Sequence, residues 1–253
     1  MKNLAILIVC NFALMAGVAC AGVLKGTVTY QSDAPVRKAI QVTKDQHCIH
    51  NLQDGKSESL VVSKERGIKN VVVYLRARKA TVTVPKKNPV MDQVNCMYYP
   101  HVLVVTKGTT VDMTSSDPVA HNVHSHATKN EAPNWQIPGP GKVLPLKLEK
   151  REPIKFTCDI HTWMRGYIFV ADNDYFSVTG YKDEEGKWMS ADVYEASSDK
   201  GTYAIEDVPS GKYRVQAWHE ELGTTKAKTL QIPASGEVEI DFTSADFKKK
   251  GVK

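Results

Sequence analysis

Short segments in which apolar and polar residues alternate recur along almost the whole sequence, and this pattern constrains the fold more than any other feature. A period of two places successive side chains on opposite faces of an extended chain, so each segment predicts a β-strand. Turn signals rich in Gly, Pro, Ser and Asp separate the segments, and only residues 183–196 carry a weak helical pattern. The predicted strands are residues 26–30, 71–75, 81–84, 102–106, 110–113, 154–158, 167–170, 203–205, 213–217, 229–232 and 237–242. Short strands at this spacing predict an all-β protein built from sandwiches or barrels.

Charge and composition exclude several classes of protein. The chain has 253 residues, of which 42% are hydrophobic and 24% charged, as in ordinary globular proteins. Its 33 basic and 28 acidic residues are spread along the chain and give a formal charge of only +5, so we expect no binding to nucleic acid. The sequence has no G-x-S-x-G motif, no H-E-x-x-H motif and no plausible Ser-His-Asp order. We therefore expect the protein not to be an enzyme.

The N-terminal segment has the pattern of a secretory signal peptide. Lys2 precedes an apolar stretch over residues 4–19, and small residues follow. Cleavage after Ala21 would remove residues 1–21; in the alternative interpretation, residues 17–20 form a lipoprotein box and Cys20 carries a lipid anchor. The stretch is short for a membrane span, and no later segment approaches about 20 apolar residues, so we expect no transmembrane segment. Both interpretations predict an exported, periplasmic or extracytoplasmic protein, and the second predicts an outer-membrane lipoprotein.

Three cysteines remain after such a cleavage: Cys48, Cys96 and Cys158. An odd number in an oxidising compartment leaves one thiol that needs another explanation. Cys48 and Cys96 lie in polar, turn-like surroundings and are the predicted disulfide pair. Closing that loop would stabilise the fold by about 4 kcal/mol in the chain-entropy treatment.

Cys158 belongs to a group of residues with the chemistry of metal ligands. It ends the predicted strand 154–158 on the core side, and His161 and Met164 follow on the same short loop. A second histidine, His121, lies in the segment 116–124, which we expect to end a strand. Two imidazoles, one thiolate and one weak thioether form the ligand set of a trigonal copper site with an axial Met. The predicted metal ligands are therefore His121, Cys158, His161 and Met164, and the predicted metal is copper.

Strand alternation predicts which way the side chains around His121 point. His121 and Val123 share one face of an extended chain, whereas Asn122, His124 and His126 share the other. We therefore expect His121 to point into the site and Asn122 to hydrogen-bond between the histidine strand and the cysteine loop. His124 and His126 are expected at the surface, with metal uptake or a second site as an alternative.

The two segments around these ligands resemble the copper-binding motifs of the amicyanin and plastocyanin group of cupredoxins. The resemblance rests on the sequence HNVH at 121–124 and on C-x-x-H-x-x-M-R-G at 158–166, and it covers residues 98–171. It implies a Greek-key β-sandwich with one type 1 copper held by the four residues named above. It also implies blue-copper electron transfer with a redox protein, such as a cytochrome or a dehydrogenase, as partner, and an edge for electron entry near His161.

The flanking sequence resembles a second kind of β-sandwich. Residues 26–35 and 201–213 are similar to the opening and closing strands of carboxypeptidase-regulatory-like sandwiches, and the whole chain resembles exported methylamine-utilisation or plastocyanin-like proteins. This implies an N-terminal β segment at 22–97, a cupredoxin domain at 98–172 and a carboxypeptidase-regulatory-like β domain at 173–253. A composite sandwich into which the histidine-rich unit is inserted is an alternative arrangement.

Two other functions are compatible with the same residues. One is copper delivery or storage, with His124, His126 and Met residues as auxiliary ligands. The other is a non-catalytic β-sandwich interaction module that needs no metal, although the four ligand-type residues argue against it.

Overall fold

The computed structural model describes residues 21–42, 45–52, 54–77, 80–180, 182 and 189–249. The predicted signal peptide up to Cys20, including the candidate lipid anchor, and the first six residues of the predicted helix 183–196 lie outside these residues. Within them, no helix has the length and apolar character that crossing a membrane requires.

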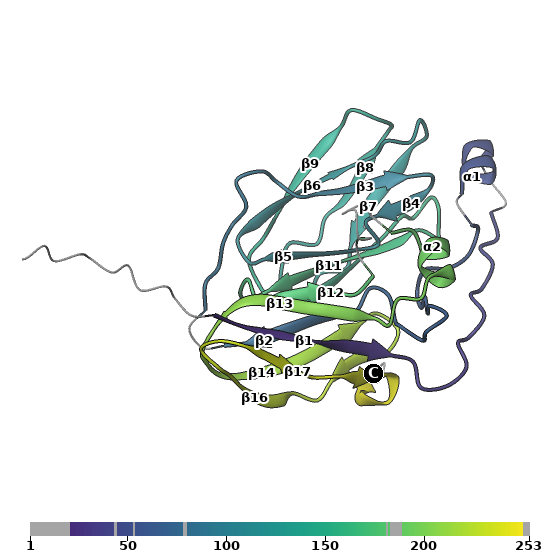
Figure 1. The fold of residues 1–253 in the computed structure, drawn as a ribbon. Coiled ribbons are helices and arrows are strands. Elements are labelled where there is room, and N and C mark those ends of the chain that lie inside the picture. Colours follow the sequence, from purple (N-terminus) through teal and green to yellow (C-terminus); the bar gives the residue numbers. More distant parts are fainter. Residues whose placement is uncertain are drawn as a thin grey trace, which may run out of the picture.

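The protein is all-β, as predicted, and its strands form two stacked groups (Figure 1). We call the group that contains β3 to β11 the upper sandwich and the group that contains β1, β2 and β12 to β19 the lower sandwich. The upper strands are β3 (Val90–Val94), β4 (Met97–Tyr99), β5 (Val102–Thr106), β6 (Thr109–Thr114), β7 (His121–Ser125), β8 (Asn134–Ile137), β9 (Val143–Leu148), β10 (Pro153–Thr157) and β11 (Arg165–Ala171). The lower strands are β1 (Ala21–Thr29), β2 (Val72–Arg76), β12 (Phe176–Val178), β13 (Thr202–Pro209), β14 (Gly211–His219), β15 (Gly223–Thr225), β16 (Lys228–Ile232), β17 (Glu237–Glu239), β18 (Phe242–Thr243) and β19 (Phe247–Lys248).

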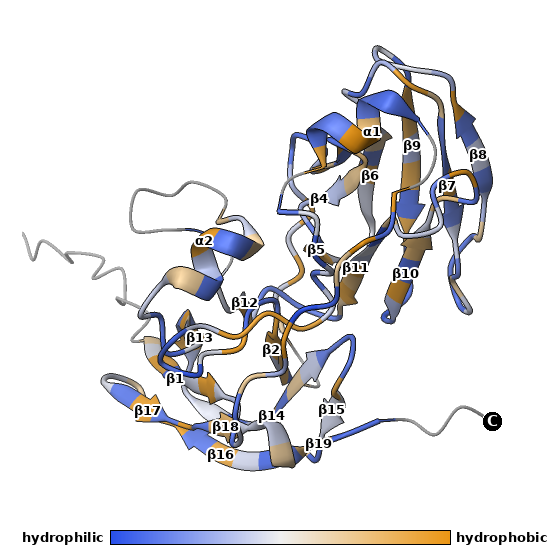
Figure 2. Cartoon of the chain, turned by 90° about the vertical axis from the view of Figure 1, so that its right-hand side faces the viewer, coloured by the Kyte–Doolittle hydropathy of each residue, from blue (hydrophilic) through white to orange (hydrophobic). Residues whose placement is uncertain are grey.

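The upper sandwich consists of two facing sheets, with strand orders β5-β11-β10-β7-β8 and β4-β3-β6-β9. Strands such as β6 and β10 alternate buried and accessible residues, and Figure 2 shows the same alternation of hydrophobic and hydrophilic residues along β9 and β10. The inward side chains, among them Val111, Ile154 and Phe156, pack into one core that also includes Cys158 and Met164. The predicted ligand loop is therefore anchored at an end of this core.

The lower sandwich is formed by segments that precede and follow the upper sandwich in the sequence. β1 pairs antiparallel with β13 and parallel with β17 and β18, while β2 pairs with β12 and β14. Its core includes Leu24 from β1 and Val215 from β14. β3 lies before residue 98, the predicted start of the cupredoxin domain, and β4 spans that residue. Both strands pair within the upper sandwich, not with the lower one.

Aromatic side chains join the two sandwiches. Phe169 of β11 lies with its ring centroid 4.9 Å from Tyr74 of β2 and 5.6 Å from Trp218 of β14. His101, just before β5, is buried between the carboxylates of Glu58 and Glu220. Apolar and ionic contacts thus both hold the upper sandwich on the lower one.

Several elements differ from the sequence expectation. Residues 81–84 form no strand; instead the N–H and hydroxyl of Thr83 both donate to the carboxylate of Asp174. The predicted strands do not include β3, β4, β8, β9, β12, β15 and β19. β9 contains Pro145 and lies at the edge of its sheet, where proline is tolerated. Two short helices, α1 (Gln46–Asn51) and α2 (Ala191–Ala196), and a 3-10 turn, η1 (Ser244–Asp246), complete the described structure.

Candidate metal centre

The predicted ligand residues come from two neighbouring strands. β7 and β11 flank β10, and the antiparallel register pairs Thr157 at the end of β10 with His124 of β7. The beginning of β7, where His121 lies, therefore meets the loop that leaves β10. That loop carries Cys158, His161 and Met164 and returns as β11.

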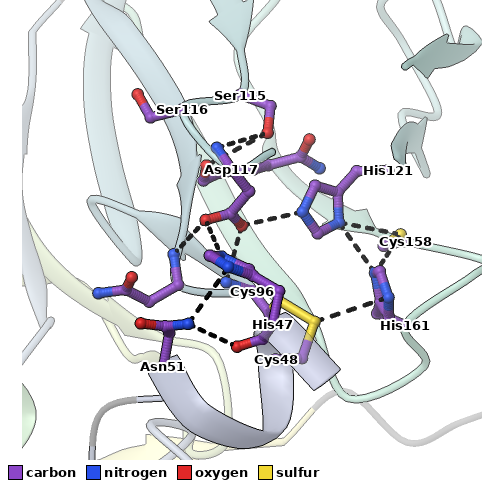
Figure 3. Close-up of polar contacts among 12 residues, drawn as sticks. His47, Cys48, Asn51, Cys96, Ser115, Ser116, Asp117, His121, Cys158 and His161 are labelled. Carbon is purple, nitrogen blue, oxygen red and sulfur yellow. Dashed lines mark hydrogen bonds and ion pairs between the residues drawn. A yellow bond between two sulfur atoms is a disulfide. The ribbon is translucent and has the colours of Figure 1, made fainter. Parts of the chain in front are cut away.

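Three donor atoms of these residues form a compact triangle (Figure 3). The Nδ1 atoms of His121 and His161 lie 2.9 Å apart, and each lies 3.9 Å from Sγ of Cys158. A point in the plane of the three atoms is about 2.1 Å from each of them, and bonds from a late first-row metal to nitrogen or sulfur measure roughly 2.0 to 2.3 Å. The three donor atoms are thus spaced as the ligands of one metal ion would be.

The site is closed to solvent. His121, Cys158 and His161 expose 0%, 2% and 2% of their surface. Met164 is fully buried in the core cluster that contains Cys158, and its N–H donates to the carbonyl of His161 at 2.9 Å. Met164 therefore belongs to the buried apolar core that also contains Cys158.

The surroundings of Cys158 favour its thiolate. Burial alone would raise the pKa of the thiol, but hydrogen bonds from His121 and from the backbone N–H groups of Asn122, His161 and Ile160 outweigh it and lower the pKa. The Asn122 N–H lies 3.4 Å from Sγ. Since a thiolate is the form that binds metals, the chain holds this sulfur ready for coordination.

Asp117 fixes the orientation of His121, and sequence reasoning did not identify it. Its buried carboxylate accepts a hydrogen bond from Nε2 of His121 at 2.9 Å, from Nε2 of His47 at 3.2 Å, and from the N–H groups of Asn95 and Cys96 at 2.7 and 2.8 Å. A carboxylate on one ring nitrogen directs the other nitrogen toward a metal. Burial lowers the pKa of His121, but Asp117 and the sulfur of Cys158 both raise it, to about 9. The one local signal was an acidic residue four positions before His121 in a Ser-Asp-Pro turn.

Asn122 connects the histidine strand to the cysteine loop. Its Oδ1 accepts the N–H of Asp159 at 2.5 Å, and its Nδ2 donates to Oδ2 of Asp159 at 2.9 Å and to Oδ1 of Asn134. Together with the contact from its own N–H to Cys158, these bonds fix the loop against β7. A side chain of this kind limits movement of the sulfur relative to His121.

The disulfide joins Cys48 in α1 to Cys96 in the turn between β3 and β4, which is the pairing predicted from the sequence. Cys158 remains a free, buried thiol. Asp45 caps α1 by accepting the N–H of His47 at 3.0 Å, so the helix begins next to the site.

α1 and the disulfide cover His161. Its Nε2 lies 3.7 Å from Sγ of Cys48 and 3.8 Å from Oδ2 of Asp45, and its ring centroid lies 5.1 Å from that of Trp163. The Trp163 indole N–H donates to the carbonyl of Cys96. The resemblance implied an edge for electron entry near His161, but in this structure Nε2 of His161 lies beneath α1 and the disulfide.

Comparisons with known proteins identify no family for the whole chain. No protein-family model and no curated protein matches the sequence. Among solved structures, a purple cupredoxin from Nitrosopumilus maritimus is 23% identical over 33% of this chain and 100% of its own, with a TM-score of 0.29. Amicyanin from Paracoccus versutus is 18% identical over 39% of this chain and 97% of its own, with a TM-score of 0.30. A copper-containing nitrite reductase from Thermus scotoductus is 23% identical over 38% of this chain and 25% of its own, with a TM-score of 0.31. Because these scores are low, conclusions about the site depend on its own geometry.

Proposed function

We propose that this protein is an exported blue-copper electron carrier. One type 1 copper would be held by Nδ1 of His121, Nδ1 of His161 and Sγ of Cys158, with Met164 as a weak axial ligand. The observation that carries this proposal is the buried triangle of two nitrogens and one sulfur whose centre lies at metal-bond distance from all three.

The donor set supports copper rather than zinc. Structural zinc sites are usually tetrahedral, with four strong ligands, whereas the described residues here supply three and a buried thioether. Two imidazoles, one thiolate and a weak axial Met are typical of blue-copper electron-transfer sites. When bound, copper supplies a one-electron couple between Cu(I) and Cu(II).

The residues around the site suit electron transfer better than catalysis. A catalytic metal keeps an open position for water or substrate, but the three donor residues are at least 98% buried. Asp117 hydrogen-bonds His121, and Asn122 hydrogen-bonds Asp159 in the loop that carries Cys158 and His161. A rigid, dry ligand set limits reorganisation when an electron arrives, so we infer that the protein is not an enzyme.

Location, partners and architecture belong to the same proposal. The disulfide between Cys48 and Cys96 supports an oxidising compartment, which agrees with the signal-peptide pattern of residues 1–21. The partners would be redox proteins, a cytochrome or a dehydrogenase. We further propose that the upper sandwich is the cupredoxin unit and that the lower sandwich is a carboxypeptidase-regulatory-like support.

The test is a visible absorption spectrum of the exported protein, expressed from the full chain, during titration with Cu(II). We expect an intense thiolate-to-copper band that saturates at one equivalent and is absent in Cys158→Ser. Ser125→Ala, which changes a buried hydroxyl on β7, is the matched control and should keep the band. A band that persists in Cys158→Ser would disprove the ligand assignment. Tight binding without any band would instead indicate copper delivery or storage.

A further inference from the structure

Two histidines outside the buried site lie side by side at the surface. His124 in β7 and His126 just after it share the outward face of the strand, with ring centroids 4.4 Å apart and ring planes inclined by 24°. The His124 side chain is 34% exposed, and His126 is exposed. The two rings are therefore stacked at the surface, where an ion in solution can reach them.

One nitrogen of each ring is already bound to a fixed oxygen. Nδ1 of His124 lies 2.8 Å from Oδ1 of Asp159, and Nε2 of His126 lies 2.8 Å from Oγ1 of Thr157. The Asp159 carboxylate is itself held by the Asn134 side chain at 2.8 Å. Among the residues that the structure describes, the opposite nitrogens, Nε2 of His124 and Nδ1 of His126, have no hydrogen-bond partner.

A hydrogen bond from one ring nitrogen to an oxygen is common among metal-binding histidines. A ligating imidazole usually directs its second nitrogen to a carboxylate or another oxygen, which orients the ring and increases the basicity of the free nitrogen. Metals bind the neutral form of an imidazole, so binding at this pair should weaken as the pH falls.

We infer that His124 and His126 form a second, solvent-accessible metal site. It would take a divalent late first-row cation through two imidazole nitrogens, with water as the remaining ligands. The usual affinity order places Cu²⁺ above Ni²⁺ and Zn²⁺ at such a site. The site goes beyond the proposed function, because its ligands are separate from the buried triangle and need no ion there.

The deciding experiment is equilibrium dialysis of the mature protein against Cu²⁺ alone, with bound metal measured by elemental analysis. We expect the double variant His124→Ala/His126→Ala to bind one equivalent less than the unchanged protein. His50→Ala, which removes an exposed histidine from α1, is the matched control and should lose none. Equal binding by the double variant and the unchanged protein would overturn the site.

This readout also separates the site from the buried centre. If the buried centre binds no copper, the unchanged protein binds one equivalent and the double variant none, and the difference of one equivalent persists. Thr157→Val should weaken the surface equivalent by about tenfold, since outer hydrogen bonds usually contribute that much to metal affinity.

A measurement without substitutions guards against misfolding of the variants. Diethylpyrocarbonate acylates free imidazole nitrogens, and peptide mass spectrometry locates the products. One equivalent of Zn²⁺ beyond saturation of the buried centre should protect His124 and His126 but leave His50 reactive. Unchanged labelling of the two histidines would contradict the proposal.

Discussion

The Nε2 atom of His161 lies 3.7 Å from Sγ of Cys48, so a disulfide rests directly on a proposed copper ligand. The second cysteine, Cys96, accepts the indole N–H of Trp163 through its carbonyl. The disulfide therefore holds α1 to the turn between β3 and β4, on top of His161. In this chain the covalent link both stabilises the fold and limits access to the site.

Replacing both cysteines, in Cys48→Ser/Cys96→Ser, should lower the free energy of unfolding by about 4 kcal/mol, because the disulfide closes a loop of 48 residues. It should also raise the reactivity of His161 toward diethylpyrocarbonate, since α1 is no longer held over it. Urea denaturation and peptide mass spectrometry measure the two effects. Ile49→Ser, on the exposed side of the same helix, is the control and should leave His161 protected. Equal labelling in all three proteins would show that α1 does not limit access.

Asp117→Asn should loosen the hold on His121. The amide keeps the size of the side chain but removes the charge that accepts the Nε2 proton at 2.9 Å. We expect copper affinity to fall by about 10- to 100-fold. In the metal-free protein, the pKa of His121 should fall from about 9 toward the ordinary value of 6.5, as followed by NMR titration. Asp112→Asn on β6 is the control; an unchanged His121 titration in Asp117→Asn would contradict the assignment.

Met164→Leu should affect the reduction potential more than copper occupancy. A weak axial ligand tunes the potential while the two histidines and Cys158 supply the binding. Loss of the thioether should destabilise Cu(II) relative to Cu(I) and raise the potential by more than about 59 mV. For a one-electron couple, that shift corresponds to a tenfold change in the equilibrium constant. Voltammetry and copper analysis report the two quantities. Met113→Leu, an equally buried methionine of the same core, should leave the potential in place. A potential that does not move would exclude Met164 as a ligand.

Glu152 makes the stability of the upper sandwich depend on pH in the acidic range. Its carboxylate accepts hydrogen bonds from Thr128, Lys129 and Asn130; although burial raises its pKa, these bonds lower it from 4.5 to about 2. The ionised form therefore contributes stability above pH 4.5, and this contribution is lost as the pH falls from 4.5 toward 2. Glu152→Gln should lower the free energy of unfolding by about 2 kcal/mol at pH 7 and make it depend less on pH between 4.5 and 2. Denaturant unfolding across this pH range is the measurement, and exposed Glu149→Gln should behave like the unchanged protein.

The parts that sequence could predict were local. The spacing of Cys158, His161 and Met164 on one short loop specifies a group of donor residues without knowledge of the rest of the fold. Alternation likewise assigned His121 and His124 to opposite faces of β7, and the structure buries the first and exposes the second in part. These assignments succeed because a strand has a fixed period of two.

The parts that sequence could not predict involve residues far apart in the chain. α1 lies over His161 although 113 residues separate Cys48 from His161. The helix has only six residues, which is too short a segment for a helical pattern to be recognised in the sequence. Asp117 looks like an ordinary turn residue until the fold brings His47 and the turn before Cys96 around its carboxylate. The sequence left sequential and inserted domains open, and the pairing of β1 with β13 depends on contacts that no local pattern encodes.

The pairing of β1 has a consequence for the order in which the molecule can assemble. Synthesis produces β1 first, but its partners β13, β17 and β18 lie between residues 202 and 243 and are made last. All strands of the upper sandwich lie between residues 90 and 171, so this sandwich can fold before the strands that pair with β1 are synthesised. The earliest strand is thus incorporated last, and the unit that carries the donor residues has the shorter-range contacts of the two, which favours its earlier folding.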